Sequence, residues 1–282
     1  MLKRYKKLAA GYRYLLLFGW IYSATAAETE RSIMHLAGDV YRFQNDAHYS
    51  VFMVTPEGVI ATDPISPEAA QWLNREIQSR FGQPVKYVLY SHDHWDHVSG
   101  GAAFNEATIV AHANAVPHIE TSDYPIELPD ITFTNEFTLT LGGKSVHLYY
   151  LGHSHSDNLI YMVFPDAGVL FGVDAISVNR LPFQDMVGTD IDGVIGSISA
   201  LEQMDVAIVA PGHGNVGSLA DLAAHREYLE KLKEQVGSRM REGKSLEQIK
   251  AEVTMSEYSH WGSYGGWQQP NVEGMYNYLI AQ

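Results

Sequence analysis

A cluster of metal-ligand residues is the feature that most restricts how this chain can fold. It directly follows the apolar run 85–90 and reads His92-Asp93-His94-Trp95-Asp96-His97. An apolar run rich in valine and tyrosine predicts a buried β-strand. Because alternate residues of an extended chain point to the same side, His92 and His94 are expected to face one metal ion. Asp96 and His97 are then directed at a second ion.

Three further candidate ligands lie downstream, each after a short apolar run that predicts a strand. The runs are 147–151, 169–172 and 206–210, and the ligands are His155, Asp174 and His213. Ligands delivered from the ends of several strands are a way for a sheet to hold a rigid metal site. Imidazole and carboxylate ligands, in a chain of 282 residues without cysteine, favour zinc first and iron or manganese next.

On these residues, the chain resembles the metallo-β-lactamase superfamily from about residue 40 to residue 213. The family motif H-x-H-x-D-H appears here as His92, His94, Asp96 and His97. The third-strand histidine, the bridging aspartate and the final Gly-His loop of the family match His155, Asp174 and His213. The resemblance implies an α/β (α+β) fold, a four-layer αββα sandwich with two metal ions at one edge of the sheets.

The resemblance also implies how the ligands divide between two Zn²⁺ ions. One ion would be bound by His92, His94 and His155. The other ion would be bound by Asp96, His97 and His213. Asp174 would bridge the two ions, together with a water molecule or hydroxide.

Two further positions are interpreted from the family pattern. His153 and His155 both fit its histidine position, and the spacing through Pro165 to Asp174 favours His155. His153 is then a loop residue or a hydrogen-bond partner. Asp63 matches a family aspartate that supports the ligand loop. Five other histidines lack such a context and are expected to be ordinary surface or core residues: His35, His48, His147, His225 and His260.

The reaction that the resemblance implies is hydrolysis. A metal-bridging hydroxide would attack the carbonyl of an ester, lactone, thioester or amide, and Asp96 would act catalytically by orienting it. The expected substrate is a small molecule, and Asn179 and Arg180, in the loop after Asp174, are candidate substrate-binding residues. Arg180 suits a substrate carboxylate such as that of a β-lactam, because a guanidinium binds a carboxylate through two hydrogen bonds.

Two other functions stay open at this point. A β-lactamase proper suits an exported enzyme, although Asp174 stands where one lactamase subclass has cysteine. An oxidoreductase similar to the persulfide dioxygenases would instead bind one iron through His92, His155 and Asp174. Metal content and oxygen uptake would distinguish these functions.

The first 27 residues have the pattern of a secretory signal peptide. Five basic residues lie within positions 3–13, and the apolar stretch 14–22 follows them. Ala24-Thr25-Ala26 then forms an A-x-A cleavage signature. The apolar stretch is shorter than a settled membrane span. We therefore expect a periplasmic or secreted bacterial protein with no stable membrane anchor after cleavage, and an uncleaved anchor is the alternative.

The exported chain is expected to be strongly acidic. The sequence has 19 basic and 33 acidic residues, a net charge of −14, and residues 1–27 contain five of the basic ones and no acidic one. Their removal leaves 14 basic against 33 acidic residues, a net charge of −19. Affinity for nucleic acid is largely a cationic effect, so no nucleic-acid partner is expected. The sequence specifies no oligomeric state.

Residues 28–282 are expected to form one domain of the metallo-β-lactamase fold, in which 219–282 is a helical C-terminal extension. A helix is also predicted at 67–81. Proline suits the first turn of a helix, and apolar residues recur there at every fourth position.

Overall fold

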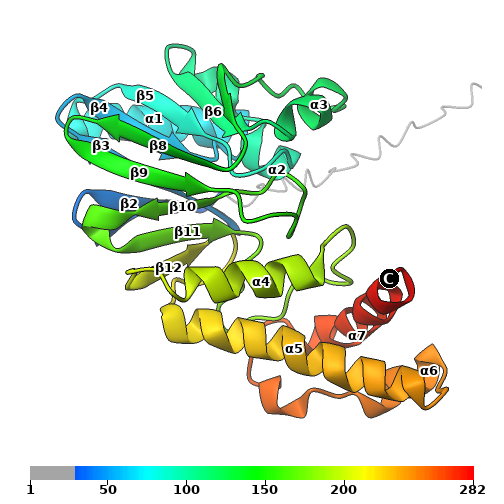
Figure 1. Ribbon diagram of the computed structural model, residues 1–282. Helices are drawn as coiled ribbons and strands as arrows, with labels where there is room; N and C mark the ends of the chain where they lie inside the picture. The colour runs from blue at the N-terminus through cyan, green and yellow to red at the C-terminus, as the bar shows by residue number, and fades with distance from the viewer. Residues whose placement is uncertain (1–28) are drawn as a thin grey trace, which may run out of the picture.

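Two β-sheets pack face to face, and helices cover their outer faces (Figure 1). The computed structural model describes residues 29–282. The predicted signal peptide, residues 1–27, lies outside the described residues. The four layers are those of an αββα sandwich, so the predicted fold class is confirmed.

The first sheet has seven strands in sequential order. They are β1 (Arg31–Ala37), β2 (Val40–Asn45), β3 (His48–Thr55), β4 (Gly58–Thr62), β5 (Val85–Leu89), β6 (Thr108–His112) and β7 (Ile131–Phe133). Strands β1 to β4 are antiparallel, and β4 to β7 are parallel. The parallel strands bring the residues that follow β4 and β5 to the same edge of the sheet.

The second sheet has five strands in the order β12-β11-β10-β9-β8. They are β8 (Glu136–Leu141), β9 (Lys144–Tyr149), β10 (Tyr161–Phe164), β11 (Val169–Val173) and β12 (Ile208–Pro211). Strands β11 and β12 are parallel and the other pairs are antiparallel. The loops after β11 and β12 therefore also leave from one edge, where the predicted ligands of these loops can meet.

Seven α-helices complete the described chain. They are α1 (Pro67–Phe81), α2 (Trp95–Val98), α3 (Ala115–Glu120), α4 (Ile191–Leu201), α5 (Leu219–Arg241), α6 (Leu246–Glu252) and α7 (Tyr264–Ile280). In Figure 1, α4 and α5 lie along the second sheet and α7 packs beside α5. Among residues 29–282, no helix combines the length and apolar character that crossing a membrane requires.

Strand residues alternate between two separate cores. In β3, Val51 and Met53 face the core between the sheets, whereas Phe52 faces the outer core. The outer core also contains Leu73 and Ile77 of α1, both fully buried. This period of two is the pattern of a strand that is covered on both faces.

The bounds of α1 follow from local sequence. The side chain of Ser66 accepts a hydrogen bond from the backbone N–H of Ala69, and Pro67 occupies the first turn. An N-cap of this kind stabilises a helix by about 1 kcal/mol. Gly82 ends the helix in the left-handed conformation, with φ of 63°. The predicted helix at 67–81 is confirmed.

The C-terminal helices hold the loop that follows β11. Asn271 of α7 is fully buried, and its Nδ2 donates hydrogen bonds to the carbonyl oxygens of Pro182 (3.0 Å) and Gln184 (2.5 Å). Its Oδ1 accepts a hydrogen bond of 2.7 Å from the hydroxyl of Tyr228 on α5. One amide thus connects α5, α7 and the loop.

Candidate metal centre

The structure brings all seven predicted metal ligands to one site at the edge of the two sheets. They are His92 and His94 in the loop after β5, Asp96 and His97 in α2, His155 between β9 and β10, Asp174 after β11, and His213 after β12. These segments are far apart in sequence, and the two parallel strand pairs make their ends converge. The candidate ligand atoms form groups in which every pair lies within 4.8 Å.

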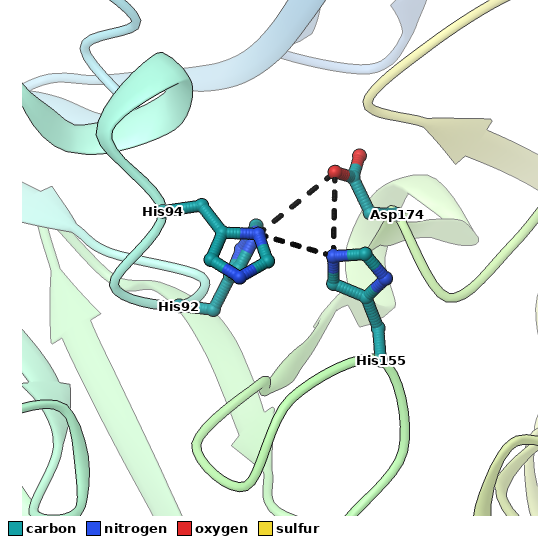
Figure 2. Close-up of side chains that lie close together, drawn as sticks. All are labelled: His92, His94, His155 and Asp174. Carbon is teal, nitrogen blue, oxygen red and sulfur yellow. Dashed lines mark hydrogen bonds and ion pairs between the residues drawn. The ribbon is translucent and has the colours of Figure 1, made fainter. Parts of the chain in front are cut away.

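The first group contains His92, His94, His155 and Asp174, whose side chains point toward one another in Figure 2. Nε2 of His155 lies 3.2 Å from Nδ1 of His94 and 3.7 Å from Oδ2 of Asp174. Nε2 of His92 lies 4.0 Å from the same carboxylate oxygen. Three imidazoles with one carboxylate are a donor set that suits zinc.

The second group shares Asp174 with the first. Nε2 of His97 lies 3.2 Å from Oδ2 of Asp174, and Nε2 of His213 lies 3.4 Å from Oδ1. Asp96 joins through an overlapping set, in which its carboxylate lies near His213 and His48. Oδ2 of Asp174 lies near histidines of both groups, and Oδ1 lies near His213 of the second, so Asp174 has the position that a bridging ligand requires.

His48, at the start of β3, was not predicted as part of the site. Its Nε2 lies 3.3 Å from Oδ2 of Asp96, and its ring centroid lies 4.7 Å from that of His213. A single histidine at the start of a strand carries no spacing signal. Its position depends on a tertiary contact, because the N–H of Tyr49 donates to the carbonyl oxygen of Gly212 at 2.8 Å.

A metal ion fits the unpaired polar atoms of this centre. Within the described chain, Nε2 of His92, Nε2 of His97 and Oδ1 of Asp174 are buried without a hydrogen-bond partner. Leaving such an atom unpaired costs about 1–3 kcal/mol, so native proteins retain few of them. A cation that accepts their lone pairs would remove this cost. The donors therefore fit a bound metal.

Asp63 and Ser91 orient the buried histidines from behind. The hydroxyl of Ser91 lies 2.7 Å from Oδ2 of Asp63 and 2.8 Å from Nδ1 of His92. Nδ1 of His97 lies 3.2 Å from the same oxygen of Asp63. The carboxylate can only accept, so we assign the ring protons to Nδ1, which leaves the Nε2 lone pairs facing the centre. Such outer partners fix the tautomer of a metal-binding histidine.

The loop after β12 holds His213 in the same way. Its Nδ1 lies 2.8 Å from the carbonyl oxygen of Ala47, so Nδ1–H donates outward and Nε2 faces the centre. The preceding residue, Gly212, lies very close to two other ligands. A Cβ at this position would be 2.8 Å from Oδ1 of Asp174 and 3.0 Å from Cε1 of His97. Any larger residue would push against the centre.

Burial and charge keep most of these ligands in their metal-binding protonation states. Burial lowers the pKa of His92 well below its usual range and the pKa of His155 to about 4. Burial alone would raise the pKa of Asp174, but the surrounding histidines hold it well below the usual range. For His97, Asp174 and Asp63 outweigh burial and raise the pKa. The same two carboxylates that favour a proton on this ring also favour a metal cation there.

A cavity of about 700 Å³ opens beside the centre. Its lining includes His94, Asp96, His155 and Asp174 on one side, and mostly apolar residues of the β11–α4 loop and the C-terminal helices elsewhere. Trp267 of α7 is one of these lining residues, and Arg180 lies over its ring at 4.6 Å. The cavity can therefore hold a partly apolar small molecule against the metal centre.

The candidate substrate-binding residues separate in the structure. Arg180 lines the cavity, and no carboxylate of residues 29–282 forms an ion pair with it. Asn179 does not line the cavity, and its amide donates to Oδ1 of Asp221 at 2.8 Å. His153 is exposed and lies outside both donor groups, whereas His155 belongs to the first. In each pair, Asn179 with Arg180 and His153 with His155, only the second residue lies at the cavity.

Comparison with known proteins identifies the family. Residues 48–213 match the family described as the metallo-beta-lactamase superfamily. The chain belongs to this superfamily. The match begins at His48 and ends at His213, so it contains both donor groups. The predicted family is confirmed, and membership implies a metal-ion cofactor.

Several relatives have different names. The chain is 32% identical to 2,4-dinitroanisole O-demethylase subunit alpha of Nocardioides sp. (strain JS1661) over 166 residues, 55% of this chain and 49% of that protein. It is 22% identical to metallo-beta-lactamase type 2 of Bacteroides fragilis over 70% of this chain and 84% of that protein. Metallo-beta-lactamase type 2 of Bacillus sp. (strain 170) is 29% identical over 50% of this chain and 56% of that protein.

A solved structure shows the same fold. The metallo-beta-lactamase from Pontibacter korlensis superposes with a TM-score of 0.64 at 20% identity, over 71% of this chain and 99% of that one. The alignment with the demethylase subunit spans only about half of that protein's length. The relatives therefore support the fold and the metal-binding character, and their different names leave the substrate to be inferred from the cavity.

Proposed function

We propose that this protein is an exported dinuclear zinc hydrolase that cleaves an ester, lactone, thioester or amide of a small molecule. The observation that carries this proposal is the pair of donor groups that share the carboxylate of Asp174. Two zinc ions, when bound, would supply Lewis acidity and lower the pKa of water toward neutrality. Members of the superfamily are mostly metal-dependent hydrolases, which agrees with this chemistry.

Asp96 is the residue that we propose acts on the attacking water. Its carboxylate lines the cavity, and a hydrogen bond with His48 fixes one oxygen at 3.3 Å. Burial alone would raise its pKa, but His48 and His97 lower the pKa to about 2. Asp96 is therefore ionised at neutral pH. It can accept a hydrogen bond from water, but it is a weak base. Its role is to orient the nucleophile.

Arg180 is proposed to hold an anionic group of the substrate. It lines the cavity without an ion-pair partner among the described residues, and Asp174 lies near enough to affect its pKa. Burial lowers the pKa of this guanidinium, but the group stays protonated at neutral pH. A carboxylate in the substrate would replace the hydrogen bonds to water that this guanidinium loses on burial. A β-lactam is one molecule with a carboxylate beside a cleavable amide, and two relatives have lactamase names.

The test combines metal analysis with a panel of substrates. The purified chain is loaded with zinc, its zinc content is measured, and 4-nitrophenyl butyrate, γ-decalactone, a thioester and a chromogenic cephalosporin are supplied. We expect two zinc ions per chain and turnover of at least one compound. A folded protein with two zinc ions that turned over none of the four would contradict the hydrolase assignment.

One observation supports a second candidate, an iron-dependent oxidoreductase of the persulfide dioxygenase kind. Within the first group, His92, His155 and Asp174 make up two histidines and one carboxylate, a set that also binds iron(II) in oxygenases. One iron per chain and oxygen uptake with glutathione persulfide would favour this candidate. Two zinc ions and no oxygen uptake would eliminate it.

The export part of the proposal depends only on the sequence of residues 1–27. Cell fractionation of a tagged full-length chain checks it, because we expect the tag in the periplasmic or secreted fraction and a shortened N-terminus. A tag that stays with the membrane at full length would instead indicate an uncleaved anchor.

A further inference from the structure

His225 lines the cavity but belongs to neither donor group. It lies on α5 and is only 3% exposed. Its Nε2 is buried and has no hydrogen-bond partner among the residues that the structure describes. This histidine lies beyond residues 48–213, which match the family, and no motif in the sequence marks it. A buried, unpaired polar atom beside a cavity calls for a partner.

The orientation of the ring determines which nitrogen carries the proton. The backbone N–H of Ser177 donates a hydrogen bond of 3.2 Å to Nδ1 of His225. A nitrogen that accepts this bond has a lone pair, so the proton of the neutral ring is on Nε2. Burial lowers the pKa of His225 to about 4, and the ring is neutral at pH 7. Nε2–H is thus an uncharged donor whose direction is fixed.

The residues around this donor are apolar. Ile191 and Val194 of α4 and Leu229, one turn after His225 on α5, line the same cavity, and each is at most 3% exposed. In contrast, the lining residues Phe183 and Val187 are 62% and 84% exposed, so the cavity is open to solvent at their loop. The His225 donor therefore lies in the buried, apolar part of the cavity. A substrate group that reaches it must be mainly apolar and must bring an acceptor.

We propose that Nε2–H of His225 donates a hydrogen bond to an uncharged acceptor oxygen, such as a carbonyl or ether oxygen, on the apolar part of the substrate. This proposal rests on the proposed function insofar as the cavity holds the substrate. It narrows the substrate class, because a plain alkyl chain would leave the donor unpaired and a carboxylate is better matched by Arg180. His225 would select among substrates and would not take part in bond cleavage.

The first test observes the ring directly in the metal-loaded protein. Long-range ¹H–¹⁵N spectra of histidine-labelled chain, with His225→Gln to assign the signal, report its tautomer. The probes are 4-phenyl-2-butanone and isopentylbenzene, which have similar shapes but differ in one oxygen. We expect the Nε2–H tautomer from pH 5.5 to 8, and a shift of the Nε2 signal with the ketone only. A proton on Nδ1, or equal responses to both probes or to neither, would overturn the proposal.

The second test separates recognition from a merely structural role. His225→Gln retains an N–H donor near the position of Nε2, whereas His225→Asn retains an acceptor for Ser177 N–H but does not reach the cavity. We expect the wild type and His225→Gln to bind the ketone about fivefold to tenfold more tightly than the hydrocarbon. His225→Asn should lose this preference. The control His260→Leu, at an exposed position, should retain it.

The opposite result, a preference retained by His225→Asn and lost by His225→Gln, would mean that His225 only positions the loop at Ser177. Thermal unfolding of each variant shows whether it is folded, and the spectra of the wild type do not depend on the variants. Neither probe contains a bond that a hydrolase cleaves. Failure of the proposed hydrolysis therefore leaves this test unaffected, and failure of this test leaves the hydrolysis unaffected.

Discussion

The cavity wall has two parts that are built in different ways. In the part that carries the donor groups, the metal end, the side chains are polar, and the histidines His92, His97 and His213 have their outer nitrogens held by hydrogen bonds. In the rest of the wall, apolar residues of α4 and α5 line the cavity together with His225, whose Nε2 has no partner among the described residues. The metal end comes from the segment 48–213 that matches the family, whereas His225, Leu229 and Trp267 lie after it. The donor groups and one part of the cavity wall thus come from different parts of the chain.

This difference limits what the relatives can say. A protein that matches only residues 48–213 matches the segment that carries the donor groups of this chain, so the comparison concerns the metal centre. The C-terminal wall of the cavity has no counterpart in that match. A lactamase or a demethylase can therefore be related to this chain without having its substrate.

The largest expected effect comes from Asp174→Asn at the metal end. The amide keeps the shape but loses the charge that offsets repulsion between two cations about 3.5–4 Å apart. We expect more than about 100-fold weaker zinc binding at both groups, since losing even an outer partner costs about 10–100-fold. Competition with a chelator at fixed pH measures this. The control is Asp166→Asn, an exposed position, and wild-type affinity at both groups would show that Asp174 is no bridge.

His155→Ala should remove one of the two ions. It takes a ligand only from the first group, so the second group should still bind zinc. The matched control is His153→Ala, two residues earlier and exposed, which should retain two ions and most of the activity. Metal analysis of the two purified variants decides the matter. The reverse stoichiometry would mean that His153 is the ligand.

His48→Ala should have a smaller effect that is confined to the second group. The residue contacts Asp96 and stacks edge-on near His213, so its loss should weaken the second ion about tenfold. The first ion should be bound as in the wild type. His35→Ala, at an exposed position on β1, is the control. If both variants bound zinc equally well, His48 would have no role in metal binding.

The smallest effect is expected at the cavity wall. Arg180→Gln should raise KM about fivefold for a substrate with a carboxylate, because a charge-assisted hydrogen bond is replaced by a neutral one, a loss of about 1 kcal/mol. KM for a neutral substrate and the zinc content should not change. Arg75→Gln, an exposed position on α1, is the control. Equal changes for charged and neutral substrates would remove the proposed role of Arg180.

The sequence predicted the metal end much better than the rest of the cavity wall. Close spacing makes His92 to His97 conspicuous, and apolar runs before Asp174 and His213 show that these residues follow strands. Such signals are local, and the parallel strands bring them together. For the same reason, the helix at 67–81 could be predicted from its first-turn proline and its periodicity.

What the sequence missed depends on tertiary contacts. His48 reaches the centre only because β3 pairs with the loop at Gly212, and His225 reaches the cavity because α5 packs beside the β11–α4 loop. A lone histidine on a helix or strand has no pattern that reveals such a neighbour. Asn179 and Arg180 are adjacent, but the direction of each side chain depends on backbone angles, since Asn179 has a φ of 49° and turns toward Asp221.

Through the amide of Asn271, the shape of the substrate cavity depends on a helix that takes no part in metal binding. This side chain holds the carbonyls of Pro182 and Gln184 from a helix that contributes no ligand, at the far end of the sequence from the histidine motif. The next turn is equally tight, because a Cβ on Gly274 would lie 1.8 Å from the carbonyl oxygen of Asp185. A substitution at Asn271 or Gly274 would therefore displace the loop that lines the open side of the cavity, without changing any residue of the donor groups.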